Sequence, residues 1–225
     1  MERDHISTIF DVELNELRQS ILVMGGKVEL MIANSVKSLV DRDTPLAERT
    51  IALDHEINAA EVSIDERCLE LLALRQPAAR DLRFITIALK IVTDLERMGD
   101  QCANIAKRVR ELNEDPPLKP YIDIPRMAQK TEEMLRGALD AFVKRDVDAA
   151  RKIIAQDDVV DNLYDQVFRE LLTYMAADPQ TINRATRLIW VAHNLERSAD
   201  RVTNICERTI FVITGKVEED GVSKY

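Results

Sequence analysis

The chain has 225 residues with a formal net charge of −9; 46% of the residues are hydrophobic, 32% are charged, and only 6 are glycine and 7 proline. This composition is typical of long amphipathic helices and argues against a turn-rich β protein. The acidic balance argues against a nucleic-acid-binding protein, which normally has a basic surface, and is compatible with cations bound by carboxylates.

The N-terminus contains no apolar stretch of signal-peptide length, and no later segment is long and apolar enough to span a bilayer. We therefore expect a soluble, cytoplasmic protein with no direct membrane span. Cys68, Cys102 and Cys206 lie in apolar-periodic segments and form no Cys-x-x-Cys motif. They are expected to be buried thiols in a reducing compartment, which disfavours a metal or redox site built on cysteine.

The sequence predicts an all-α fold of six long helices, arranged as two tandem antiparallel three-helix bundles. The helices of the first half are expected at residues 4–42, 44–75 and 77–113. Those of the second half are expected at residues 124–145, 147–176 and 179–214. Pro45 and Pro77 suit first-turn positions, and Gly215 suits the end of the last helix.

The second half of the chain repeats the first. Residues 134–154 match residues 31–51 at an offset of 103, with a Val-x-Arg-Asp sequence in each copy, while Leu195-Glu196-Arg197 matches Leu95-Glu96-Arg97 at an offset of 100. The second copy has therefore lost three residues between these points. Three prolines between the copies mark the joint, because proline cannot continue a helix. The predicted domains are a first bundle over 1–113, a linker over 114–122, a second bundle over 123–214 and a charged tail over 215–225.

Acids four residues apart border the predicted buried face of the third helix in each copy. Glu96, Asp100 and Asn104 recur as Glu196, Asp200 and Asn204. The second helices carry further pairs, which the sequence aligns at an offset of 100: Glu61 and Asp65 with Asp161 and Asp165. If neighbouring helices bring these acids together, each bundle presents a cluster of carboxylates along one groove, with the asparagines as extra oxygen donors.

Acids at this spacing repel one another on a helix, and a bound cation would relieve that repulsion. Oxygen-only donor sets suit Mg, Ca, Mn or Fe. The competing interpretation is a solvated acidic surface neutralised by Arg97, Arg197 and Arg201. Recurrence of four pairs in the two copies favours metal binding. His193 falls on the face of Glu196, but its equivalent is Thr93, so we expect it to be a polar flanking residue.

We expect ordinary structural roles for two further features of the sequence. Trp190, Tyr164 and Phe168 are expected in the core. The basic helix start at residues 75–83 is expected to be solvated surface, although an anion or acidic partner could dock on Arg75, Arg80 and Arg83.

The chain resembles the PhoU family of phosphate-transport accessory proteins over nearly its whole length. The resemblance rests on His5, Phe10 and Met24-Gly25, on Ala-Arg-Asp-Leu-Arg at 79–83, and on the duplicated Leu-Glu-Arg-x-x-Asp-x-x-x-Asn-Ile pattern. Ser198-Ala199-Asp200 departs from the family's usual Ile-Gly-Asp, which bears on packing more than on ligation.

The resemblance implies multinuclear metal clusters, of iron, with Mg, Mn or Zn also possible. Its metal motif maps to the acid pairs named above, with Asp161 a shorter carboxylate than Glu61. It further implies a non-enzymatic, cytoplasmic and often dimeric regulator. This regulator would repress the phosphate-starvation response and restrain phosphate uptake, acting between the ATPase subunit of the phosphate ABC transporter and a sensor histidine kinase.

Two alternatives to this adaptor stay open. One is a carboxylate-bridged metalloenzyme in a helical bundle, although such enzymes use Glu-x-x-His pairs that point into a core, and we expect no such pair here. The other is a helical scaffold that binds no metal, in which the acids serve only solubility.

Overall fold

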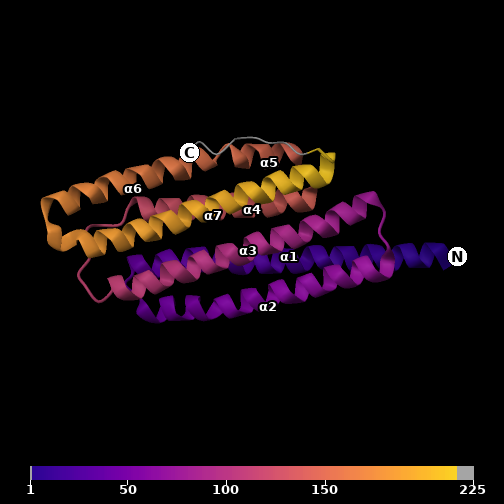
Figure 1. Ribbon diagram of the computed structural model, residues 1–225, viewed down its shortest axis with the longest axis horizontal. Coiled ribbons are helices and arrows are strands. Elements are labelled where there is room, and N and C mark those ends of the chain that lie inside the picture. Colours follow the sequence, from indigo (N-terminus) through magenta and orange to yellow (C-terminus); the bar gives the residue numbers. More distant parts are fainter. Residues whose placement is uncertain (1, 217–225) are drawn as a thin grey trace.

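The structure, a computed structural model, describes residues 2–216 and the side chains of residues 9–216; this part of the chain is helical and contains no strand. The first bundle comprises α1 (Glu2–Val40), α2 (Thr44–Arg75) and α3 (Ala79–Leu112). The second comprises α4 (Asp123–Lys144), α5 (Val147–Ile154), α6 (Asp157–Ala177), the 3₁₀ helix η1 (Pro179–Thr181) and α7 (Ile182–Thr214). The long helices run side by side along one axis (Figure 1). The predicted all-α architecture is confirmed.

Two of the predicted helices have boundaries that differ from those observed. The helix predicted over 147–176 is broken at Ala155 and Gln156, where the Gln156 N–H bonds to the Ile153 carbonyl at 2.9 Å in a tight turn. No proline or glycine marks this break, so the sequence pattern does not reveal it. Pro77 lies outside α3, which begins at Ala79, whereas Pro45 does occupy the first turn of α2. The tail predicted from residue 215 lies largely outside the described residues.

The repeated Val-x-Arg-Asp sequence makes the same helix junction in both bundles. Arg42 and Arg145 adopt the left-handed conformation, with φ of 55° and 57°. The carboxylates of Asp43 and Asp146 then accept hydrogen bonds from backbone N–H groups three residues on, at 2.8 and 2.9 Å. Such N-caps satisfy donors that the first helical turn leaves unpaired. The repeat therefore encodes a turn and a helix start together.

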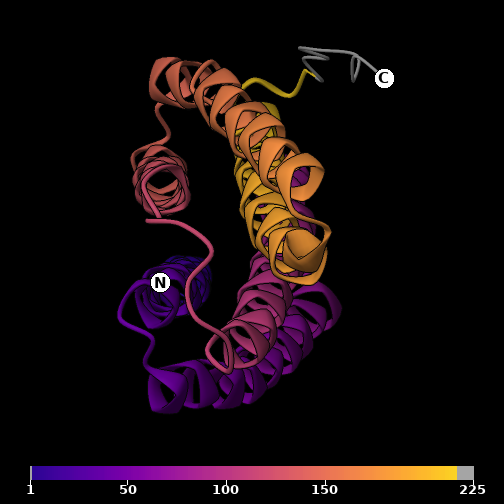
Figure 2. The same cartoon turned by 90° about the vertical axis from the view of Figure 1, so that its left-hand side faces the viewer.

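The two bundles join along two helix pairs, with α3 packed on α7 and α1 on α4 (Figure 2). The predicted buried faces of α3 and α7 are confirmed, and so is the burial of all three cysteines. A side chain added at Gly99 would come within 3.1 Å of Ile57 Cγ2, so α2 and α3 approach closely there. This close packing places the bordering acids of α2 beside those of α3.

Candidate metal centre

Carboxylates of α2 and α3 lie near one another beside the core of the first bundle. Burial raises the pKa of Glu61, and the charges of Asp65 and Asp100 raise it further. Burial also raises the pKa of Glu96, to which the charges of Asp100, Glu61 and Asp54 add. Mutual influence of this kind arises only between neighbouring charges. We call Asp54, Glu61, Asp65, Glu96 and Asp100 the first carboxylate cluster.

A second carboxylate cluster lies between α6 and α7 and comprises Asp157, Asp161, Glu196 and Asp200. Burial raises the pKa of Glu196 to about 7, with contributions from the charges of Asp200, Asp161 and Asp157. Burial likewise raises the pKa of Asp157 to about 7, followed by the charges of Asp161 and Asp200. Two carboxyl groups of this cluster therefore resist ionisation near neutral pH unless a positive charge joins them.

Asp100, Asp161 and Asp200 are exposed residues, although the charge of Asp100 raises the pKa of Glu96 and those of Asp161 and Asp200 raise the pKa of Glu196. Three further predicted positions stand at the margin of the clusters. The Asp165 side chain is 62% exposed and pairs with Arg169 at 3.4 Å, so it faces water, although its charge still raises the pKa of Asp161. Asn104 is exposed, and its side-chain oxygen accepts a hydrogen bond from Lys107 at 3.4 Å. Asn204 is partly buried one turn beyond Asp200.

The pattern of burial explains the position of Asp165. The buried residues of α2 coincide with those of α5 and α6 at an offset of 103: Ala47, Thr50, Ile57, Ile64 and Cys68 with Ala150, Ile153, Val160, Val167 and Leu171. The offset of 100 assumed between Glu61 and Asp161 is therefore wrong. Asp165 corresponds to Val62, which is itself exposed, and the three lost residues belong to the connection between α6 and α7.

Corrected alignment identifies cluster residues that the sequence analysis missed. Asp54 corresponds to Asp157, and Asn58 corresponds to Asp161. The sequence does contain a signal for these residues. Asp54 and Asn58 are four residues apart, as are Asp157 and Asp161, and the two pairs are related by the offset of 103 seen in the Val-x-Arg-Asp repeat. Asp54 belongs to the first cluster, because its charge contributes to the raised pKa of Glu96.

Aromatic residues replace part of the acid row in the second bundle. Tyr164 and Phe168 take the places of Glu61 and Asp65, and the Tyr164 ring lies 6.3 Å from Phe168 and 5.9 Å from His193. The Trp190 ring packs edge-on against His193 at 6.0 Å. Trp190 is 52% exposed and Phe168 38%, so their expected place in the core is wrong. The second cluster consequently contains four carboxylates, whereas the first contains five.

The donor chemistry of both clusters fits a hard cation. Among the described residues, buried oxygens without a hydrogen-bond partner include Asp54 Oδ1, Asn58 Oδ1 and Asp65 Oδ1 in the first bundle. In the second bundle, Asp157 Oδ1 is the counterpart of Asp54 Oδ1, whereas the buried Glu196 Oε2 lies 3.3 Å from His193 Nδ1. Buried carboxylate oxygens left unpaired are costly, and a cation would satisfy them.

The described side chains of the two clusters do not, however, converge into a complete set of metal ligands. Within the described part of the chain, no three His, Cys, Asp or Glu side chains converge closely enough to hold a metal ion. Arg97 and Arg197 form no ion pair within 4.0 Å in this part of the chain. Their charges lower the pKa values of Glu61, Glu96 and Glu196 against the larger effect of burial, so these arginines neutralise the acids only in part. Arg201 lies close enough to Asp200 to lower its pKa against the dominant effect of burial, but its ion pair is with Asp94.

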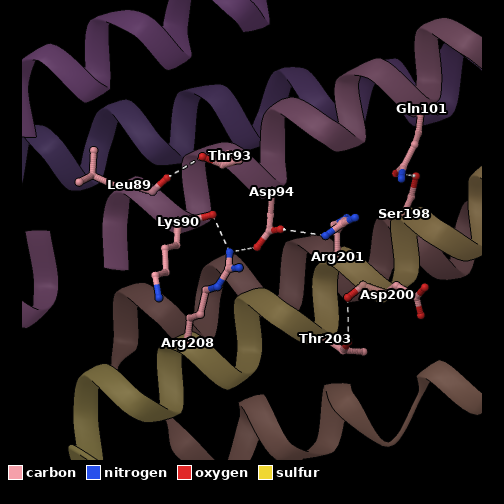
Figure 3. Close-up of polar contacts among 10 residues, drawn as sticks. All are labelled: Leu89, Lys90, Thr93, Asp94, Gln101, Ser198, Asp200, Arg201, Thr203 and Arg208. Carbon is pink, nitrogen blue, oxygen red and sulfur yellow. Dashed lines mark hydrogen bonds and ion pairs between the residues drawn. The ribbon is translucent and has the colours of Figure 1, made fainter. Parts of the chain in front are cut away.

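A buried polar joint connects the second cluster to the first bundle (Figure 3). Asp94 on α3 is only 1% exposed and pairs with Arg208 and, at 3.6 Å, with Arg201, both on α7. Two helical turns further along α3, Gln101 accepts a hydrogen bond from Ser198 of α7 at 2.8 Å. Across the repeat, Asp94 aligns with Asn194, Gln101 with Arg201 and Ser198 with Met98. These pairings are therefore not duplicated, and they fix α3 and α7 in one register. Arg201 thereby stands between the joint and Asp200.

Together, the fold and the clusters define a duplicated helical protein with acids aligned beside the cores of both halves. The family model of the PhoU domain matches the chain twice, at residues 21–109 and 124–209. The chain therefore belongs to the PhoU family.

Named relatives and solved structures agree with this membership. A Phosphate-specific transport system accessory protein PhoU homolog from Pseudomonas aeruginosa is 40% identical over 212 residues, which are 94% of this chain and 88% of the relative. PhoU from Escherichia coli is 35% identical with the same coverage. The crystal structure of PhoU from Pseudomonas aeruginosa matches with a TM-score of 0.88 at 39% identity, covering 92% of this chain and 100% of that one. The structure from Streptococcus pneumoniae gives 0.87 at 34% identity, covering 93% and 99%.

Proposed function

We propose that this chain is a metal-binding regulatory adaptor that restrains phosphate uptake and represses the phosphate-starvation response. The family and the names of its relatives support a role in the regulation of phosphate transport. The observation that carries the metal-binding part is the set of buried carboxylate oxygens without partners in both bundles. In this proposal a cation neutralises each cluster, so that metal occupancy influences how the two bundles present their surfaces.

Each bundle would hold its cation between two helices. Glu61, Asp65, Glu96 and Asp100, with Asp54, are the ligands proposed for the first bundle. Asp157, Asp161, Glu196 and Asp200 are those proposed for the second. Asn104, Asn204 and Asp165 would join only after their side chains rotate inward. Carboxylate-rich sites accept iron, Mg or Mn readily, and Zn with fewer ligands. Since the second cluster contains fewer carboxylates, it would hold fewer ions than the first.

The partners proposed for the adaptor are the ATPase subunit of the phosphate ABC transporter and a sensor histidine kinase. The adaptor would act on the cytoplasmic side of the membrane as a homodimer. No helix in the part of the chain that the structure describes is long and apolar enough to cross a membrane. This finding suits a protein that reaches membrane partners through contact.

The proposed adaptor performs no chemical turnover. The competing metalloenzyme would need metal-bound histidine. His193 packs among Tyr164 and Trp190, and its Nδ1 lies 3.3 Å from Glu196 Oε2. A Glu-x-x-His sequence does occur at Glu2 to His5, whose side chains lie outside the described residues. Oxygen consumption at catalytic rates by the protein with ferrous iron would favour the enzyme over the adaptor.

Deletion of the gene in its native host tests the regulatory role. We expect alkaline phosphatase activity to rise during phosphate-replete growth, because repression is lost. Wild-type protein supplied in trans should restore repression, whereas Asp100→Asn combined with Asp200→Asn should not. Unchanged alkaline phosphatase in the deletion strain would contradict the regulatory role, and full rescue by the double variant would separate regulation from the clusters. Co-purification with the transporter ATPase at high and low phosphate tests the partner directly.

A further inference from the structure

Four arginines that form no ion pair with the described acids lie away from both carboxylate clusters. They are Arg18 of α1, Arg80 and Arg83 in the first turns of α3, and Arg145 at the end of α4. Within residues 9–216, none of the four forms an ion pair within 4.0 Å. Arg75, which the sequence analysis grouped with Arg80 and Arg83, is excluded because its guanidinium forms a two-pronged contact with Glu13 at 2.6 and 2.9 Å.

Aromatic packing links Arg18 to the segment that carries Arg145. The Arg18 guanidinium lies over the ring of Phe84, 4.6 Å from its centre. Phe84 stacks on Phe142 at 5.6 Å, and Phe142 precedes Arg145 by three residues. Burial lowers the pKa of Arg145, and the positive charges of Arg80 and Arg18 lower it further, with Asp81 offsetting part of the effect. Three helices, α1, α3 and α4, thus bring like charges together.

The repeat supplies an internal comparison for Arg145. Its equivalent, Arg42, has the same left-handed backbone, but its guanidinium donates a hydrogen bond to the Asn113 carbonyl at the end of α3, at 2.7 Å. Arg42 therefore serves the structure, whereas Arg145 faces other arginines. The neighbouring carboxylate of Asp146 is occupied in capping α5, so it does not neutralise Arg145.

The chain leaves α7 beside this group. The start of α3 and the end of α7 lie at the same end of the molecule (Figure 1). At Gly215, whose φ is 71°, a side chain would come within 2.5 Å of Arg83 Nη1, so backbone and guanidinium are in close approach. Arg83 Nε is buried and has no hydrogen-bond partner in the described structure. The next acids in the sequence are Glu218, Glu219 and Asp220.

We propose that Arg18, Arg80, Arg83 and Arg145 form an oxyanion-binding site. Guanidinium groups present paired N–H donors that match the oxygens of phosphoryl and carboxylate groups, and clustered guanidiniums favour an anion with more than one negative charge. Two sources supply this chemistry: the carboxylates of the chain's own acidic tail and a free phosphoryl anion. Binding of either would neutralise the arginines and tie α1, α3 and α4 to the end of α7.

Calorimetric titration of the full-length chain with inorganic phosphate, at constant ionic strength, tests the site. A variant with Glu218→Gln, Glu219→Gln and Asp220→Asn keeps the full chain but removes the tail's charge. In that background, Arg80→Gln or Arg145→Gln should weaken phosphate binding about tenfold, since each removes a charged donor. Arg110→Gln, an exposed arginine in the last turn of α3, is the charge-matched control and should leave binding unchanged.

Comparison of the two backgrounds identifies the source of the anion. Tighter phosphate binding after neutralisation of the tail shows that the tail's carboxylates compete for the site, whereas equal affinity assigns the site to the free anion. Absence of phosphate binding in both backgrounds would overturn the proposal. Retention of full affinity in both Arg80→Gln and Arg145→Gln would also overturn it; because Arg80 is exposed, its variant is expected to fold normally.

Discussion

The substitution Glu196→Gln should stabilise the metal-free protein at alkaline pH while leaving its stability in acid nearly unchanged. The pKa of Glu196 is raised from 4.5 to about 7, chiefly by burial and then by the charge of Asp200. Between these two pH values the folded chain holds a proton that the unfolded chain has released. The free energy of unfolding therefore falls as the pH rises through this window, and the loss is complete above about 7.

The size of the effect follows from the two pKa values. At about 1.4 kcal/mol per pH unit, the rise from 4.5 to about 7 corresponds to about 3 kcal/mol. The side chain is only 11% exposed, so solvent screens little of this energy. Glutamine keeps the shape and removes the charge, so the variant should exceed the wild type by about 3 kcal/mol at pH 8, or about 6–12 °C in melting temperature.

Urea unfolding of chelator-treated protein between pH 4 and pH 8 measures this difference. Glu66→Gln, which removes an exposed carboxylate on α2, is the matched control and should show no such pH dependence. Saturating Mn²⁺ should raise the stability of the wild type at pH 8, by about 2.7 kcal/mol at one hundred times the dissociation constant, and should raise that of Glu196→Gln less. A difference between variant and wild type that is the same at every pH would refute the reasoning.

Three further substitutions test the fold through thermal unfolding. Asp94→Ala should cost about 3 kcal/mol, because it leaves the Arg208 guanidinium without its buried partner; a loss below 1 kcal/mol would show that the joint between the bundles is not held by this pair. Gly215→Ala should cost about 1 kcal/mol, because its φ of 71° is unfavourable for residues with a Cβ; an unchanged melting temperature would contradict this. Asp43→Ala should also cost about 1 kcal/mol through loss of the cap on α2, and Asp41→Ala, a neighbouring exposed acid, is its control.

Local patterns in the sequence predict most of the fold. Apolar periodicity locates the helices and their buried faces, and the Val-x-Arg-Asp repeat marks two junctions because a left-handed residue and an N-cap are both local features. The break between α5 and α6 is not predicted, since neither proline nor glycine marks it. Tertiary packing, rather than local preference, must determine that position.

The candidate site is only partly predictable because it depends on alignment between helices. The acid pattern that recurs in α3 and α7 correctly predicts that Glu96 and Glu196 occupy equivalent positions. In α6, Asp161 and Asp165 have the same spacing as Glu61 and Asp65, which suggests an incorrect alignment at an offset of 100. The pattern of burial shows instead that Asp157 belongs to the cluster and that Asp165 faces water. The joint around Asp94 is equally hidden, since its two arginines lie more than one hundred residues away in sequence.

Metal content of the purified full-length protein tests most directly whether the carboxylate clusters hold cations. Elemental analysis should be performed on the wild type, Asp100→Asn, Asp200→Asn and the double variant after equilibration with the same metal. We predict that Asp100→Asn loses the ions of the first bundle and Asp200→Asn those of the second, and that the double variant is nearly free of metal. Equal metal content in all four proteins would contradict the account.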